Sequence, residues 1–403
     1  MSGSVPGGDR PGGPEMARAQ LARALHDSGR TPSPAVEAAF GSVPRHLFVP
    51  QLDPAAAYAD DALVIKYDAD GLPVSSSSQP AMMAIMAEQL GLEPGHRVLE
   101  IGTGSGYNAA VLAHIVGPGG QVVTIDLDAE LTDQARDRLR VAGYGAVTVR
   151  CADGGFGDPA RAPFDRVIVT AGAWDIAPAW LDQLGPGGRL VLPLSVRGIH
   201  LSVALERRAD HWAAASAFRC GFVRMAGAFA DPELLASLGS ARYAQAGGGA
   251  PVAAGALAAA LSAGPVAEAG TGAAEAGLGD VSDLDLWLTL TQPELGRLTV
   301  ISTGPGGPLP FGGLSRGHDA SDLGIIAVAR SGGEIVVRGY GPCGPALAAD
   351  LARLAPAWVA RGRPGAATLQ LTAWPPGAPP PAAAGQLTLG RPHIQLAAGW
   401  PAG

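Results

Sequence analysis

Three alternate glycines follow a short apolar run near residue 100. Val98–Ile101 leads into Gly102, Gly104 and Gly106, and Asn108–Val116 then has the composition of a helix. Glycines in such a turn adopt positive φ angles and let a ligand lie against bare backbone. A tight strand-to-helix turn needs glycine even without a ligand, so this segment alone leaves a ligand-binding loop and a purely structural turn as open interpretations.

Acidic residues follow the next two apolar runs. Asp126 comes directly after Gln121–Ile125, and Asp153 and Gly154 follow Val147–Cys151. An acidic residue about 20 positions after a glycine loop is placed to accept hydrogen bonds from ribose hydroxyls. Asp126 is also suited to cap the helix that follows it. Asp153 is placed to meet an adenine amino group, so the three loops together favour a nucleoside-bearing cofactor.

The elements that must position these loops alternate between short apolar runs and helical patterns. The runs that we expect to be strands are Val98–Ile101, Gln121–Ile125, Val147–Cys151, Arg166–Val169 and Gly188–Pro193. Helical patterns lie between several of them, as at Leu131–Ala142 and Pro178–Leu184. This alternation predicts an α/β fold with a parallel sheet. The carboxyl ends of such strands form the edge at which open α/β sheets bind ligands.

The length of 403 residues favours two domains. We expect a disordered leader over residues 1–14, a first domain over 15–230, an Ala/Gly-rich connector over 231–280 and an α+β accessory domain over 281–403. The accessory domain is predicted from four strands, one helix and a segment able to return to the sheet: Leu284–Leu290, Arg297–Ser302, Gly324–Ala329, Glu334–Gly339, Pro345–Arg361 and Thr368–Ala373.

Composition narrows the functional classes. Hydrophobic residues make up 47% of the chain and charged residues 16%, which is typical of a globular protein with a sizeable core. The net charge of −8 offers no basic surface for a phosphate backbone, so nucleic acid is not expected as a partner. Cys151, Cys220 and Cys343 lie far apart and form no metal-binding pair. With no apolar stretch long enough to span a bilayer, we expect a cytoplasmic protein that is not inserted in a membrane.

The glycine loop differs from that of dinucleotide-binding proteins. The loop opens with Glu100 and lacks the G-x-G-x-x-G spacing of a pyrophosphate cradle. Five segments resemble the protein-L-isoaspartate O-methyltransferase family: Val43–Pro50 (VPRHLFVP), Tyr58–Asp60, Glu100–Ala113 (EIGTGSGYNAAVLA), Ala162–Ala171 (APFDRVIVTA) and Gln183–Pro193 (QLGPGGRLVLP). The resemblance covers about Ala17–Gly198, half of the chain.

The resemblance implies a Rossmann-like, S-adenosyl-L-methionine-dependent methyltransferase domain. The cofactor-binding residues that we predict from it are Ser76, Ser77, Glu100, Gly102, Gly104, Gly106, Asp126, Leu127, Asp153 and Gly154. Ser78 falls at the family's active-site serine, in a loop that covers the cofactor and positions the methyl acceptor. The residues alone would instead suggest a flexible polar loop in which Ser78 caps the helix that begins near Pro80.

The predicted reaction is methyl transfer to an aspartyl or isoaspartyl carboxylate of a peptide, leading to a succinimide (aspartimide). Ser76 and Ser77 replace the family's usual Thr-Ile, and some 200 further residues follow the matched region. These departures resemble a branch associated with ATP-grasp-modified ribosomal peptides, so tailoring of such a peptide is favoured over isoaspartyl repair. A cofactor-binding scaffold without catalysis is the alternative of another class. A nucleic-acid methyltransferase is disfavoured because Val169–Ala173 lacks the expected Asn/Asp-Pro-Pro-aromatic motif.

Overall fold

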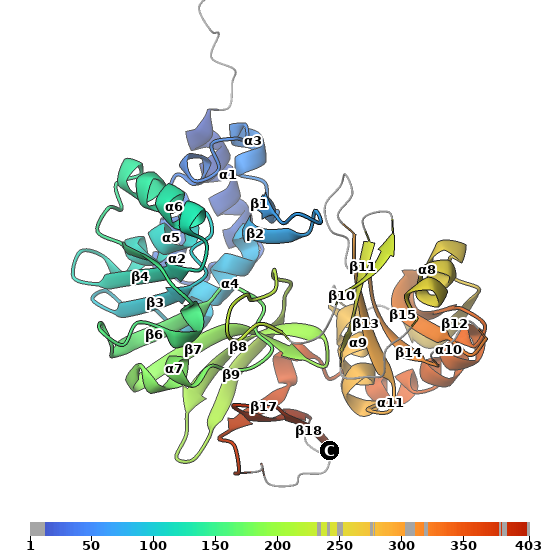
Figure 1. Ribbon diagram of the computed structural model, residues 1–403. Coiled ribbons are helices and arrows are strands. Elements are labelled where there is room, and N and C mark those ends of the chain that lie inside the picture. The colour runs from blue at the N-terminus through green and yellow to red at the C-terminus, as the bar shows by residue number, and fades with distance from the viewer. Residues whose placement is uncertain are drawn as a thin grey trace, which may run out of the picture.

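Two lobes with separate β-sheets make up the computed structural model (Figure 1). The structure describes residues 13–231, 235–239, 242–247, 253–274, 277, 279–302, 311–317, 321–378, 380 and 385–400. The N-terminal lobe holds a ten-stranded sheet and a two-stranded hairpin, and the second lobe holds a seven-stranded sheet. Most of the predicted leader lies outside the described residues. No helix in the described ranges is long and apolar enough to cross a membrane.

Short helices and a hairpin precede the large sheet. They are α1 (Pro14–Asp27), α2 (Pro34–Ser42), η1 (Arg45–Leu47), α3 (Pro54–Ala57), β1 (Leu63–Tyr67), β2 (Pro73–Ser77) and α4 (Pro80–Leu90). All four α-helices carry proline in the first turn, where its fixed φ suits the helix and its missing N–H leaves no bond unmade. Leu21 and Leu25 of α1 are buried.

The predicted parallel sheet is confirmed. Its strands are β3 (Arg97–Ile101), β4 (Gln121–Asp126), β5 (Thr148–Cys151), β6 (Phe164–Val169) and β7 (Leu184–Val196), in the order β5-β4-β3-β6-β7. The helices between them are α5 (Tyr107–Val116), α6 (Ala129–Val141) and α7 (Pro178–Asp182), with η2 (Gly154–Phe156) after β5. Neighbouring strand residues such as Val98 and Leu99 are both fully buried but in different clusters, because both faces of the sheet are covered.

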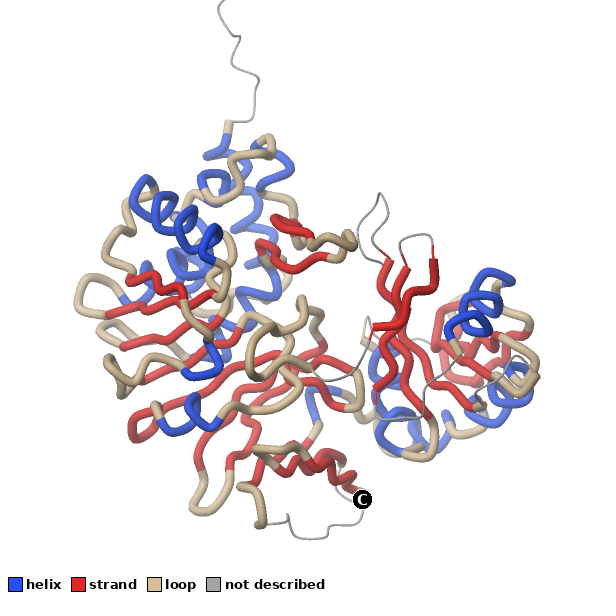
Figure 2. The backbone as a smooth tube through the Cα atoms, in the orientation of Figure 1, coloured by secondary structure: helices blue, strands red, loops and turns tan. Residues whose placement is uncertain are grey.

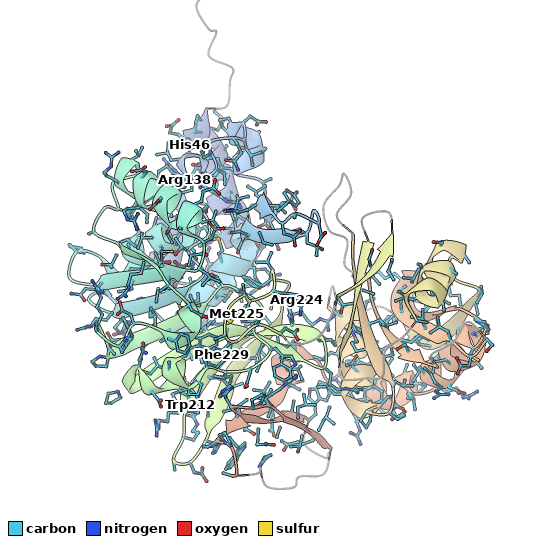
Figure 3. All side chains as sticks on the ribbon, viewed as in Figure 1. His46, Arg138, Trp212, Arg224, Met225 and Phe229 are labelled. Carbon is cyan, nitrogen blue, oxygen red and sulfur yellow. The ribbon has the colours of Figure 1, made fainter. Side chains whose placement is uncertain are left out.

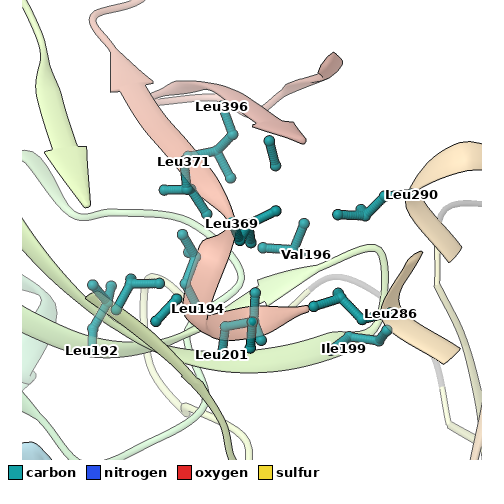
Figure 4. Close-up of a cluster of buried hydrophobic side chains, with 14 of the residues drawn as sticks. Leu192, Leu194, Val196, Ile199, Leu201, Leu286, Leu290, Leu369, Leu371 and Leu396 are labelled. Carbon is teal, nitrogen blue, oxygen red and sulfur yellow. The ribbon is translucent and has the colours of Figure 1, made fainter. Parts of the chain in front are cut away.

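Antiparallel strands extend this sheet beyond β7. They are β8 (Ile199–Arg207), β9 (Trp212–Arg219), β17 (Gln370–Trp374), β19 (Gln395–Gly399) and β18 (Gln386–Gly390), in that spatial order. The last three come from the predicted accessory domain, so residues 281–403 do not form one unit as we expected. Leu371 and Leu396 explain the difference, since they are buried beside Leu194 in the core of the N-terminal lobe (Figure 4).

The second lobe is inserted between β9 and β17 (Figure 1), and its strands are flanked by helices (Figure 2). Its sheet runs in the order β10 (Leu235–Gly239), β11 (Arg242–Gly247), β13 (Gly296–Ser302), β14 (Phe311–Arg316), β15 (Gly324–Ser331), β16 (Glu334–Tyr340) and β12 (Ala267–Ala274), with every pair antiparallel. Its helices are α8 (Ala254–Ala263), α9 (Asp280–Thr291), α10 (Gly344–Ala352) and α11 (Ala355–Ala360), and η3 (Ala366–Thr368) leads back to the N-terminal lobe.

Several segments of this lobe have a different secondary structure from the one predicted. The expected connector 231–280 contains β10, β11, α8 and β12, and β12 pairs with β16 although it is built from alanine, glycine and threonine with one glutamate. The predicted strand Leu284–Leu290 belongs to α9. All seven of its residues are buried, so the segment lacks the alternation of buried and exposed positions that distinguishes a helix from a strand. The predicted helix Pro345–Arg361 is divided into α10 and α11, with Pro356 in the first turn of α11.

A buried ion pair joins the lobes. Asp285 of α9 accepts two hydrogen bonds from Arg297 of β13, at 2.5 and 2.9 Å, and one from Arg219 of β9, at 3.1 Å. Burial disfavours the ionised Asp285 carboxylate, but Arg297 and Arg219 outweigh that effect and lower its pKa. Arg197 of the N-terminal lobe also contacts this helix. It donates hydrogen bonds to four carbonyl oxygens in or just after α9, those of Thr289, Gln292, Pro293 and Leu295.

Replacing Asp285 by asparagine is expected to lower the free energy of unfolding by about 3–5 kcal/mol, because Arg297 and Arg219 would keep their buried charges without a counter-ion. The folded pKa lies below the unfolded value of 3.8, so ionised Asp285 stabilises the fold above that value and loses its effect as pH falls through the lower pKa. Urea unfolding checks this. The control Asp350→Asn breaks an exposed pair with Arg353 and should cost less than about 1 kcal/mol; equal costs would contradict the interpretation.

Candidate active site

One pocket lies at the carboxyl edge of the parallel strands. Its walls are the glycine loop, the ends of β4 and β6, the start of η2, the segment Val223–Ala226 and the serine strand, by which we mean Val74–Ser77 of β2 with Ser78 after it. Eight of the eleven sequence-predicted site residues line it: Ser76, Ser77, Ser78, Gly102, Gly104, Asp126, Leu127 and Gly154. The structure therefore brings together the loops that were predicted to meet at this edge, and it places the serine strand beside them.

The glycine loop approaches its neighbours so closely that side chains are excluded. Gly102 has φ 102°, and a Cβ atom there would lie 2.4 Å from the Thr170 hydroxyl oxygen. Gly104 has φ 51°, and a Cβ atom there would lie 3.2 Å from the carbonyl oxygen of Ser76. The backbone of Gly104 thus faces the serine strand directly, and glycine leaves its peptide groups uncovered.

Asp126 supports this loop from the end of β4. Its Oδ2 accepts a hydrogen bond from the Gly104 amide at 3.0 Å, and its Oδ1 accepts one from the Asp128 amide at 3.2 Å. The helix-cap alternative for Asp126 is wrong, because Asp128 caps α6 by accepting from the Leu131 amide. The Asp126 carboxylate has about four lone-pair sites and so keeps acceptor capacity for a ligand's hydroxyl groups.

Three predicted site residues stand behind the pocket surface. Glu100 is fully buried and accepts hydrogen bonds from the Thr124 hydroxyl at 2.6 Å and the Asn108 side-chain amide at 2.7 Å. Asp153 accepts from the backbone amides of Gly155 and Ala228. Gly106 is the third. It is the N-cap residue of α5, and its backbone is in the left-handed conformation. All three hold the walls in place from outside the lining.

Arg45 holds the serine strand. This arginine comes from the segment Val43–Pro50, has no exposed surface and donates hydrogen bonds to five carbonyl oxygens. Its acceptors are Ala57, Ala59, Asp61, Ser77 and Ser78. The planar guanidinium has five N–H donors in a fixed fork, so one side chain fixes both the loop after α3 and the end of β2.

The helix-cap alternative for Ser78 is also wrong. Helix α4 begins at Pro80 with Gln79 as its N-cap residue, and no side chain of that cap residue bonds the first turn. Instead, Asp60 accepts a hydrogen bond from the Ala81 amide at 2.8 Å. The Ser78 side chain is therefore not used as a cap, and Ser78 lines the pocket.

Lys66 ties the β1–β2 hairpin to the start of α6. Its ammonium lies 2.6 Å from the Asp128 carboxylate and 2.8 Å from the Glu130 carboxylate, at the start of α6. These contacts raise the pKa of Lys66, with the hydrogen bond to Asp128 as the largest cause. The β1–β2 hairpin is thus tied to the helix that follows Asp126 and Leu127, so the serine strand and the predicted ribose site are held together.

The wall formed by residues 223–226 was not predicted. Its backbone is fixed by Gly172, whose amide donates to the Val223 carbonyl at 2.7 Å and whose carbonyl accepts from the Met225 amide at 3.1 Å. Figure 3 places Arg224, Met225 and Phe229 along this segment. No local motif marks these residues, because their positions depend on contacts with chain some 50 residues away.

The residues present fit S-adenosyl-L-methionine. Asp126 offers acceptors for ribose hydroxyls, Ile101, Ile125 and Leu127 offer apolar surface for a purine, and the glycine backbone leaves room for close approach. Ser77 has a fully buried hydroxyl for which no hydrogen-bond partner occurs among the described residues. A buried hydroxyl of this kind is costly unless a ligand or water satisfies it.

Comparison with known proteins identifies the fold that carries this site. A solved structure of a protein-L-isoaspartate O-methyltransferase superposes with a TM-score of 0.50 at 22% identity and covers 88% of this chain and 96% of its own, so the fold is that of a Rossmann-like methyltransferase. The enzyme of Methanopyrus kandleri with the same name is 43% identical over 195 residues, 48% of this chain and 84% of the relative. That of Hyperthermus butylicus is 40% identical over 222 residues, 53% of this chain and 90% of the relative.

The family follows from a match over more than half of the chain. Residues 16–228 match the family described as Protein-L-isoaspartate(D-aspartate) O-methyltransferase (PCMT). The chain belongs to this family and is an S-adenosyl-L-methionine-dependent methyltransferase. The matched range ends just beyond Ala226, so it includes every wall of the pocket.

Replacing Glu100 by glutamine is expected to remove a pH dependence of stability. Burial raises the pKa of Glu100 from 4.5 to about 7, so the folded protein keeps a proton that the unfolded chain loses between these values. Wild-type stability should therefore fall as pH rises from 4.5 to 7, by up to about 3 kcal/mol. The variant should lack this slope and retain cofactor affinity, since Glu100 does not line the pocket.

Urea unfolding at pH 5 and pH 8, with calorimetric titration of S-adenosyl-L-methionine, checks both parts. Glu93→Gln is the control, because the Glu93 side chain is 76% exposed. An equal pH slope in wild type and Glu100→Gln would show that Glu100 does not titrate as described.

Proposed function

We propose that this chain transfers a methyl group to an aspartyl or isoaspartyl carboxylate of a peptide. The observation that carries the proposal is that Ser78 lines the same pocket as the glycine loop and Asp126. Asp126 and Leu127 would hold the ribose and Gly154 the adenine side, with Asp153 bracing that wall from behind. In the same assignment, the methionine part meets Ser76, Ser77 and the backbone of Gly102 and Gly104, while Glu100 and Gly106 support that loop from behind.

The chemistry asks little of the protein beyond orientation. Bound S-adenosyl-L-methionine supplies an electrophilic methyl group on a positively charged sulfur. A peptide carboxylate with a reference pKa near 4 is already ionised at neutral pH, so no general base is needed. Its oxygen forms a bond to the methyl carbon while the sulfur–carbon bond breaks and the electron pair stays on sulfur. Ser78 donates one hydrogen bond to the acceptor carboxylate and thereby aims its other oxygen.

Orientation and partial desolvation can supply the catalytic effect. Holding two reactants in line is worth up to about 7–11 kcal/mol of barrier. The resulting methyl ester loses methoxide far more readily than the free acid loses hydroxide. The next backbone nitrogen therefore attacks the ester carbonyl and closes a succinimide, and its proton leaves with methoxide as methanol. The Arg45 fork serves this purpose, because it holds the main chain of Ser77 and Ser78 without touching the reactants.

Within this activity, we favour tailoring of a ribosomally made, macrocyclised peptide, in which an aspartate becomes an aspartimide. The support is that Ser76 and Ser77 stand where the family usually has Thr-Ile, directly before the active-site serine Ser78. Repair of isoaspartyl proteins is the second candidate. It is supported by the solved isoaspartate methyltransferase that covers 88% of this chain, because a second lobe is then no mark of tailoring.

A direct experiment separates these roles. Purified protein is incubated with S-adenosyl-L-methionine and either a linear L-isoaspartyl peptide or a side-chain-crosslinked macrocycle bearing aspartate, and the products are weighed by mass spectrometry. Tailoring predicts a methylene mass gain, followed by loss of methanol, with the macrocycle. Repair predicts the gain with the linear peptide. No gain with either peptide would support a non-catalytic scaffold.

Replacing Ser78 by alanine is expected to lower kcat by roughly ten- to hundredfold, because a hydrogen bond to a charged acceptor is worth about 1.5–3 kcal/mol. Affinity for S-adenosyl-L-methionine should change little. Methyl transfer to the better peptide, measured with radiolabelled cofactor, checks the first part and calorimetry the second. Ser28→Ala at the end of α1 is the control and should match wild type. Full activity in Ser78→Ala would remove this serine from the mechanism.

A further inference from the structure

The two sides of the pocket carry opposite charges. Among the described residues that line it, Asp126 is the one acidic residue and Arg224 the one basic residue. Asp126 sits at the predicted ribose end, next to Gly104. Arg224 lies in the wall that was not predicted from sequence, where the chain leaves the N-terminal lobe toward the second lobe (Figure 3). A cation at this position needs an explanation in an enzyme whose cofactor is itself positively charged.

Arg224 is held in place by its surroundings. Its Nη2 donates to the Asp231 carbonyl at 2.8 Å, and the same nitrogen lies 3.9 Å from the Asp231 carboxylate, whose side chain is only 4% exposed. The backbone on both sides of Arg224 is bonded to Gly172, three residues beyond the end of β6. A quarter of the Arg224 side chain remains exposed. The guanidinium is therefore held by Asp231, and the residue lines the pocket.

We propose that Arg224 binds the acceptor carboxylate of the peptide and so makes the enzyme specific for an acid over the corresponding amide. This inference rests on the proposed function. A guanidinium matches a carboxylate in shape and charge, and such charge-assisted hydrogen bonds are about twice as strong as neutral ones. Ser78 and Arg224 line one pocket from different segments, so the acceptor is gripped by a hydroxyl and a cation together.

The charge balance of the reaction supports this role. Before transfer, the acceptor is negative and the sulfonium positive, and Arg224 adds a second attraction for the acceptor. After transfer, the ester and the thioether product are both neutral, so Arg224 no longer holds the peptide and release is favoured. A peptide amide, such as asparagine or isoasparagine, carries no charge and never gains this attraction.

The test compares binding of an acid and its neutral isostere. Protein saturated with S-adenosylhomocysteine is titrated with a fluorescent L-isoaspartyl peptide and with the same peptide bearing isoasparagine, and anisotropy gives both dissociation constants. Wild type should prefer the acid by at least about tenfold. Arg224→Gln and Arg224→Met should reduce this preference to within about twofold. Methyl transfer to the acid peptide is measured in parallel.

Two further variants separate binding from a structural role. Arg208→Gln removes an arginine from the turn between β8 and β9, at the opposite edge of the sheet, and should keep the wild-type preference. Asp231→Asn weakens the ion pair but keeps the carbonyl contact, so it should retain most of the preference. A loss of preference in Asp231→Asn as large as in Arg224→Gln would mean that the Arg224–Asp231 contact matters only for the fold, and would overturn the proposal.

The remaining outcomes are equally decisive. An unchanged acid preference in both Arg224 variants would overturn the role of Arg224 while leaving the methyl-transfer function intact. Loss of S-adenosylhomocysteine binding in both variants would assign Arg224 to the pocket wall and would also overturn it. Wild-type protein that neither methylates the acid peptide nor prefers it over the amide would overturn the proposed function, and the Arg224 inference with it.

Discussion

The parallel pairing of β3 with β4 and β6 is the constraint on which the site depends. Ile101 is opposite Ile125 on one side and Val169 on the other, so the chain turns out of all three strands at the same level. Gly102, Asp126 and Thr170 follow at once, and hydrogen bonds cross between them: the Gly102 amide donates to Ile125, and the Thr170 hydroxyl donates to Gly102. A pocket at this edge is a consequence of register, and the residue types there decide what it binds.

Local signals explain how much of the site could be predicted. The glycine loop is recognisable within about ten residues, Asp126 by its spacing of about 20 residues from that loop, and the serine run through its resemblance to the family. The structure brings all three into one pocket. Which residues face the ligand could not be read in this way. The Glu100 side chain points into the sheet, where Thr124 and Asn108 use both of its oxygens, while neighbouring Gly102 lies in the lining. The backbone around Arg224 is held by hydrogen bonds to Gly172 and Asp153, and no local sequence motif marks it.

The second lobe shows where periodicity fails. Helix α9 is buried between its own sheet and the N-terminal lobe, with Leu286 and Leu290 near Val196 and Ile199 (Figure 4). Its four leucines, Leu284, Leu286, Leu288 and Leu290, fall at every second position, and the polar residues Asp285 and Thr289 between them are buried as well, so the sequence resembles a strand. Strand β12 was missed for the opposite reason. Its alanines and glycines have low strand propensity, and only its pairing with β16 makes it a strand. The parallel strands were predictable because both of their faces are covered and their loops carry glycine.

The insertion of the second lobe has a consequence for the pocket. The chain leaves the N-terminal lobe through the segment that forms the wall at Arg224, and it returns in β17–β19, whose last turn packs on the same segment. There the His393 ring lies 5.0 Å from the Phe229 ring, and His393 bonds the buried Asp175 through both its backbone amide and its ring. The proposed reaction uses no general base and depends on orientation and partial desolvation, so it is favoured by a wall anchored at Ala228 by Asp153 and at Phe229 by the turn before β19. That turn therefore also steadies the wall that carries Arg224.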